Sequence, residues 1–268
     1  MTRYVHLLTL LGVIGVPVVG WFVEDWSGGT TLAVYWFETV AGSVFIVGRI
    51  LLHRRWTPRR GHFQYTAPAG ERRSVTSSSF LSGFAVVCFA FSAAHAVFLA
   101  AIFLLLDHNG KSDLAEINWR SVAFGCLGVV AFLAVDFVLD LFTLRRWPFW
   151  QIEQTAQRSF SRVVVVHLTL ILGFVGVALT DSPCAFFGTF VVLKSLAALS
   201  GALPQWEPAT PPKWFSNLMN RVPNVHPGEK FEDYWAEDRV KEQKRREKNE
   251  QPWTTGRRRF GKSAGRKA

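Results

Sequence analysis

The sequence predicts an all-α fold: a polytopic bundle of six transmembrane helices, followed by a charged C-terminal tail that is partly helical or disordered. Two observations lead to this fold class. Hydrophobic residues make up 49% of the 268-residue chain, and the mean hydropathy is +0.17 although long charged blocks lower that average. Six apolar runs are each close to the ~20 residues with which a helix crosses the ~30 Å hydrocarbon core of a bilayer. A soluble domain is therefore disfavoured.

The six runs can be justified in order. The first carries Gly12, Gly15 and Gly20, which permit close helix contact, and it lacks a clear cleavage site, so we interpret it as a retained span. The third run is unusually long, and we expect it to tilt or to begin at the interface. Pro183 cannot continue a helix and separates the fifth run from the sixth. The expected spans are about 4–23, 31–52, 78–106, 120–144, 163–180 and 185–203.

The charges of the loops predict the topology. The loop at 53–74 has six Arg and one Glu, and the loop at 145–162 has four Arg and one Glu. The three intervening loops carry acidic residues instead, with a single Lys among them. Because Lys and Arg accumulate in cytoplasmic loops, we expect both termini to lie in the cytoplasm and the protein to reside in the cell (inner) membrane.

The tail at 204–268 differs in composition from the spans. It opens with a Pro-rich linker, and the segment 229–250 can form a helix with Glu–Lys and Glu–Arg pairs at i,i+4. Its last residues have too little apolar content to fold. With 15 basic and 9 acidic residues, the tail is expected to contact anionic lipid or a protein partner. Nucleic acid is a less favoured partner, because no nucleic-acid-binding module accompanies the charge.

Glu38 is the residue that most needs explaining, because a carboxylate inside a span is costly unless it has a partner. It lies seven residues from the outer end of its span, and Lys194 lies nine residues from the outer end of the sixth, so their depths agree within about one turn. We expect an ion pair there. Either the pair only selects which helices meet, or it forms a polar centre that binds an ion, a proton or a ligand. The candidate polar centre comprises Tyr35, Trp36, Glu38, His95 and Lys194.

A second group of charges is expected nearer the cytoplasm. Asp136 and Asp140 lie one turn apart near the C-terminus of the fourth span, where negative charge is unfavourable without cations. Arg49 enters the inner leaflet at a matching depth, and His167 lies close to the same boundary. We therefore predict an ion-pair cluster of Arg49, Asp136, Asp140 and His167; the alternative is a cation or shared-proton site.

We expect no metal site and no disulfide framework. A lone His on a span more often packs through hydrogen bonds than it ligates a metal, which needs three or four converging donors. The three cysteines, at 88, 126 and 184, are far apart and are interpreted as small hydrophobes.

Three short segments carry a family resemblance: YWFE at 35–38, RSFSRVVVVHLTLILGFVGVAL at 158–179 and FVVLKSLAAL at 190–199. In this order they resemble a family of prokaryotic multi-pass membrane proteins that is a domain of unknown function, over most of residues 10–203. Thr39 stands where that family has Asn, and the third span lacks the family's Tyr-Gly and its further His. The resemblance implies no activity. It implies that the family's polar positions are Tyr35, Trp36, Glu38, His95, His167 and Lys194.

Three functional classes stay open. A carrier of protons, ions or small solutes would use Glu38, Lys194 and His95 as a buried relay. A structural or partner-binding protein would use the polar centre only for helix specificity. A membrane-embedded enzyme would use Glu38 and His95, although the sequence contains no nucleophile elbow, zinc-protease, phosphate-loop or dinucleotide motif, and its catalytic residues and cofactors stay unknown.

Overall fold

The fold was analysed in a computed structural model, which describes residues 2–68, 79–108, 110, 116–161, 183–200, 208–222, 228 and 230–254. The regular structure of these residues is helical, apart from one isolated antiparallel bridge between Arg59 and Pro252. A further helix covers 149–161. The named helices are α1 (Thr2–Phe22), α2 (Gly28–Trp56), α3 (Arg60–Phe63), α4 (Phe80–His108), α6 (Trp119–Leu144), α8 (Pro183–Ser200), α9 (Lys213–Met219) and α10 (Phe231–Glu250).

Four of these helices, α1, α2, α4 and α6, are long and apolar enough to cross a membrane. They coincide with the first four expected spans, and α8 overlaps the sixth. The fifth expected span, together with His167, lies outside the residues that the structure describes.

The second helix is longer than the expected span 31–52. The side chain of Ser27 accepts a hydrogen bond from the backbone N–H of Thr30 and caps its N-terminus. The last turn contains His53, Arg54 and Arg55, and positive charge is favourable at a helix C-terminus. The extra turns are therefore stabilised locally by their own caps and charges.

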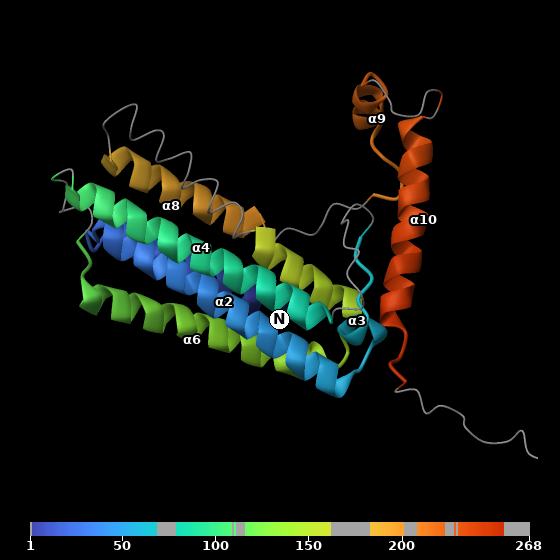
Figure 1. Cartoon of the computed structure of the whole chain (residues 1–268), viewed down its shortest axis with the longest axis horizontal. Coiled ribbons are helices and arrows are strands. Elements are labelled where there is room, and N and C mark those ends of the chain that lie inside the picture. Colours follow the sequence, from blue (N-terminus) through green and yellow to red (C-terminus); the bar gives the residue numbers. More distant parts are fainter. Residues whose placement is uncertain are drawn as a thin grey trace, which may run out of the picture.

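The long helices lie side by side, and α2 is at the centre of the bundle (Figure 1). It packs against α6 on one side and α4 on the other, while α1 contacts α6, α8 and α2. Helix α10 crosses one end of this bundle at a steep angle. We call this end, where α2 and α6 finish and α4 begins, the α10 end.

Large side chains fill the contacts between the helices. Near the α10 end, Ile50, Leu144 and Phe149 are almost completely buried and join α2, α6 and the helix at 149–161. At the opposite end the ring of Trp26 packs close to Gly20 of α1 and Gly125 of α6. Within a bilayer such close packing, rather than exclusion of water, holds helices together.

The predicted tail helix is present as α10. Both expected i,i+4 pairs form: Lys241 Nζ lies 2.8 Å from Glu237 Oε1, and Arg246 Nε lies 2.8 Å from Glu242 Oε1. The C-terminal half of α10 packs against α3. Residues 255–268 lie outside the described part of the chain.

Candidate functional site

The expected contact between Glu38 and Lys194 is present. Lys194 Nζ of α8 lies 2.5 Å from Glu38 Oε2 of α2. The lysine side chain is 8% exposed and the glutamate side chain 18%, so the carboxylate is the more accessible partner. Two helices that are distant in sequence are thus joined by a nearly buried pair of opposite charges, as the depth of each residue in its span predicts.

Tyr35 completes the surroundings of the ammonium group. Lys194 Nζ lies 3.3 Å from the centroid of the Tyr35 ring, close enough for a cation–π interaction. Tyr35 is itself buried, in a cluster with Leu99 of α4 and Val191 of α8. The ammonium group therefore has two favourable partners at once, a carboxylate and an aromatic face.

The other two residues expected in the polar centre belong to the contact between α2 and α4. The indole of Trp36 donates a hydrogen bond to the carbonyl oxygen of Ser92, at 2.9 Å. His95 lies one helical turn after Ser92 on α4 and is 1% exposed. The geometry gives Trp36 a structural role: it ties α2 to α4 beside the charged pair.

Arg49 lies between Asp136 and Asp140, two of the residues expected to share an ion-pair cluster with it. Its Nη2 lies 2.7 Å from Asp136 Oδ2 and its Nε lies 2.7 Å from Asp140 Oδ2. The guanidinium group also lies over the ring of Phe137, 5.4 Å from the centroid. One arginine of α2 thus bridges two carboxylates of α6, one turn apart.

A fourth member of this cluster was missed by the sequence analysis. His6 of α1 places Nδ1 at 2.7 Å from Asp136 Oδ1 and Nε2 at 3.6 Å from Asp140 Oδ1. The imidazole of α1 is therefore hydrogen-bonded to Asp136 and lies beside Asp140. The signal was available, because His6 lies two residues inside the first expected span, within one residue of the depth of Arg49 in the second.

Two groups of buried polar contacts lie at the α10 end, and neither group was expected. His53 Nδ1 lies 2.7 Å from His62 Nε2, and His53 Nε2 lies 2.9 Å from the carbonyl oxygen of Trp147. Glu153, the one acidic residue of a basic loop, lies 2.6 Å from Arg245 Nη1 of α10. Loop residues and a tail helix meet here, and no periodicity in the sequence predicts such a contact.

The described residues contain no group of three or more His, Cys, Asp or Glu side chains arranged to hold a metal ion. The polar sites consist of ion pairs instead. At Glu38, Arg49 and Glu153 buried carboxylates are balanced by basic groups, whereas His53 and His62 form a contact without a carboxylate.

Comparison with known proteins identifies a family for this chain but no activity. No curated protein matches the chain, and no solved structure does. A family of unknown function (DUF6498) matches residues 1–248, which include the polar centre, the ion-pair cluster and nearly all of α10. This chain, with its apolar helices and buried charges, therefore belongs to that family of unknown function.

Proposed function

We propose that this chain is a six-span membrane protein with both termini in the cytoplasm, and that it carries a proton or a small cation at the Glu38–Lys194 pair. The charges at the two ends of the bundle support the topology. Arg54 and Arg55 end α2, and Arg145 and Arg146 follow α6 at the α10 end. Acidic residues lie in the connections at the opposite end, at 24–25, 107 and 116. Positive charge marks the cytoplasmic side.

The observation that carries the proposal is the double contact of Lys194. Its ammonium group lies 2.5 Å from Glu38 and 3.3 Å from the centre of the Tyr35 ring. When Glu38 accepts a proton or a cation, the ammonium loses its carboxylate partner but keeps the aromatic face. The cost of separating the pair is thereby reduced, which is the requirement for a carboxylate that binds and releases an ion in a low-dielectric site.

Exposure assigns the exchanging role to the carboxylate. The Glu38 side chain is 18% exposed, against 8% for Lys194, so an ion reaches the carboxylate first. The ion-pair cluster lies eleven residues further along α2, at Arg49, which is ~16 Å at ~1.5 Å per residue. In this proposal it holds α1, α2 and α6 together at the cytoplasmic end.

Ion flux into proteoliposomes tests the proposal. The purified protein is reconstituted with a pH-sensitive dye inside, and proton entry is followed after a pH step, with and without a potassium gradient. We expect Glu38→Gln to abolish the flux while the protein remains folded. Val240→Ala, on the exposed face of α10, is the matched control and retains it. Wild-type flux in Glu38→Gln would overturn the proposal.

A second candidate is a purely structural role for the pair. The observation that favours it is that Glu38, Trp36 and Arg49 each join α2 to a different helix: α8, α4 and α6. Unfolding in detergent separates the two roles. If Glu38→Gln and Lys194→Met each lower the unfolding temperature and the double variant recovers it, while the wild type carries no flux, the pair is structural.

A further inference from the structure

Helix α9 presents an apolar face that the rest of the described chain leaves exposed. Trp214 is 67% exposed and Leu218 is 53% exposed, and the two residues lie four positions apart in α9. Spacing by four places side chains on one face of a helix. The ring of Phe215 lies 5.3 Å from that of Phe231 on α10 and 5.5 Å from that of Trp214, so Phe215 joins the helix to α10. The short helix is thus amphipathic, and its outward face is the unpartnered one.

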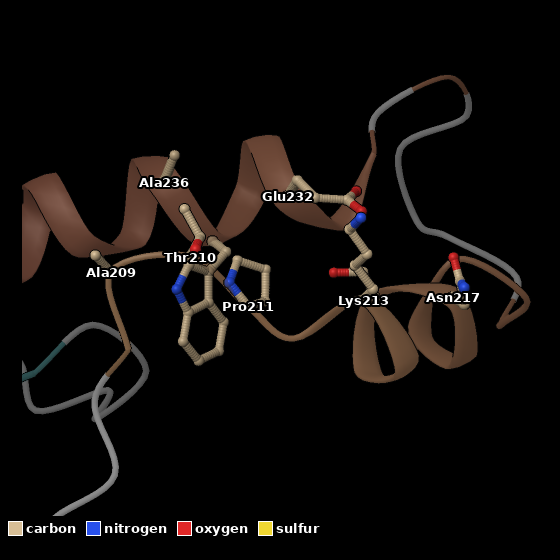
Figure 2. Close-up of a pocket in the computed structure, with 9 residues that line it drawn as sticks. Ala209, Thr210, Pro211, Lys213, Asn217, Glu232 and Ala236 are labelled. Carbon is tan, nitrogen blue, oxygen red and sulfur yellow. The ribbon is translucent and has the colours of Figure 1, made fainter.

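This face is held in a fixed orientation by α10. Asn220 Oδ1 accepts a hydrogen bond from the backbone N–H of Phe231 at 2.8 Å, and Asn220 Nδ2 donates to Glu232 Oε2 at 3.2 Å. Figure 2 shows Thr210 and Pro211 of the preceding linker between α9 and α10, where they line a groove of about 380 Å³. Because α9 is already fixed against α10, its exposed apolar side chains are positioned before they meet a partner.

The position of α10 indicates where that face points. The face that carries Arg245 meets the end of the bundle, through Glu153 and Thr66. Tyr234 lies about three turns earlier on the same face of α10. It is 58% exposed, because this part of α10 extends beyond the bundle. In Figure 1, α9 lies on the bundle side of this free half of α10. With the spans in a membrane, that is the side of the bilayer surface.

The charge of residues 208–222 indicates which lipid composition this segment would favour. Residues 208–222 contain two basic residues: Arg221, which is exposed, and Lys213, which lines the groove together with Glu232 of α10. Trp and Tyr are enriched where headgroups meet acyl chains, and a basic residue near an acidic lipid surface contributes roughly 1 kcal/mol. An exposed Trp–Leu face flanked by cations therefore fits a surface of acidic phospholipid.

We propose that α9 is an interfacial anchor, which inserts Trp214 and Leu218 into the cytoplasmic leaflet beside the bundle and binds acidic phospholipid through Lys213 and Arg221. The inference rests on the proposed membrane topology, but not on ion transport. It gives the tail a defined lipid contact at its beginning, where it leaves the last span, rather than at its basic C-terminus.

Site-directed spin labelling tests the anchor in the full chain. In a cysteine-free background, a nitroxide is attached at Leu218→Cys, at Val240→Cys on the opposite face of α10 from Asn249, and at Leu127→Cys, which is 66% exposed on α6. The protein is reconstituted in phosphatidylcholine vesicles with and without phosphatidylserine. Collisions with oxygen report lipid, and collisions with a water-soluble nickel chelate report water.

We expect the label at 218 to resemble the lipid-facing label at 127, with an oxygen-to-nickel ratio several-fold above that at 240, and a higher ratio with phosphatidylserine. A label at 218 that is as accessible to nickel as the label at 240 overturns the anchor. If the label at 127 is also in water, the proposed topology fails; if 127 is in lipid and 218 is not, only the anchor fails.

Hydrogen exchange of the unmodified protein provides a second measurement if the cysteine-free chain does not fold. The amides of 208–222 are compared in nanodiscs of the two lipid compositions. Slower exchange with phosphatidylserine supports the anchor, and exchange independent of the lipid contradicts it.

Discussion

Arg245 of α10 and Glu153 of the helix at 149–161 form a bidentate pair. Nη1 donates to Oε1 at 2.6 Å and Nη2 donates to Oε2 at 3.1 Å, and the two side chains are 8% and 3% exposed. The hydroxyl of Tyr65 donates to the same carboxylate. Burial lowers the pKa of Arg245, but the hydrogen bonds that it donates to Glu242 and Glu153 outweigh burial, so the pKa is raised above its usual value. The tail helix is thus held to the bundle by a permanent charge.

Arg245→Met should release the C-terminal half of α10. Removing one partner of a buried pair leaves an uncompensated charge, which typically costs ~3–5 kcal/mol. Hydrogen exchange of 231–254 should therefore accelerate strongly. Lys244→Met, at the exposed neighbouring position, is the control and should exchange as the wild type does. Equal exchange in both variants would show that the pair does not hold the helix.

Gly125→Ala should loosen the packing of α6 around Trp26. A Cβ at 125 would lie 2.7 Å from Trp26 Cη2 and 3.0 Å from Val34 Cγ2, and both of those side chains are buried. Overpacking of this kind costs ~1–3 kcal/mol, which should appear as a lower unfolding temperature in detergent. Gly15→Ala adds a methyl group where no atom lies within 4 Å and should leave that temperature unchanged. The reverse order of the two variants would be incompatible with this packing.

His62 should make the folded state less stable in acid. Burial is the main cause that lowers its pKa to about 3, aided by His53, Arg54 and Arg59. In the unfolded chain His62 binds a proton near pH ~6.5, but in the folded chain it does not. The contribution of neutral His62 to the free energy of unfolding is therefore fully present above that pH. It then falls by up to ~1.4 kcal/mol per pH unit as the pH drops toward 3.

The measurement is the unfolding temperature in detergent from pH 7 to pH 5. His62→Gln should flatten this profile, whereas His108→Gln, at an exposed helix end, should leave it as steep as in the wild type. If His62→Gln loses stability across this range as fast as the wild type, the imidazole does not account for the pH dependence.

Trp36→Phe should weaken the contact between α2 and α4 without removing ion flux. The variant loses one hydrogen bond to the Ser92 carbonyl, which is worth ~0.5–1.5 kcal/mol, but keeps an aromatic ring. Flux in proteoliposomes should remain near the wild-type value. Complete loss of flux in a folded Trp36→Phe protein would place the indole in the transport step instead.

The sequence was most informative where a feature depends only on position along a helix, such as the length of an apolar segment or the depth of a charged residue within it. Apolar length predicted the first four spans within a few residues, and counting residues from the span ends paired Glu38 with Lys194 and Arg49 with Asp136. A charge within a span has few partners at its own depth, so depth alone nearly determines the pair.

Depth does not reveal contacts outside the spans. Arg245 and Glu153 lie 92 residues apart in segments with no common reference plane, and their meeting depends on how α10 crosses the bundle. The same holds for His53 and His62, whose approach depends on the turn into α3. His6 was missed for a different reason: its two partners on α6 had already been assigned to Arg49 and His167.

The pairing of Glu38 with Lys194 also has a consequence for synthesis of the protein. The two residues are 156 positions apart, so at ~5–20 residues per second the ribosome completes the lysine on the order of 10 s after the glutamate. Arg49 meets its first aspartate earlier, after 87 positions. In the proposed topology, newly inserted α2 therefore carries an acidic group without its ion-pair partner until α8 is inserted. A nascent chain truncated before residue 194 keeps Glu38 without that partner.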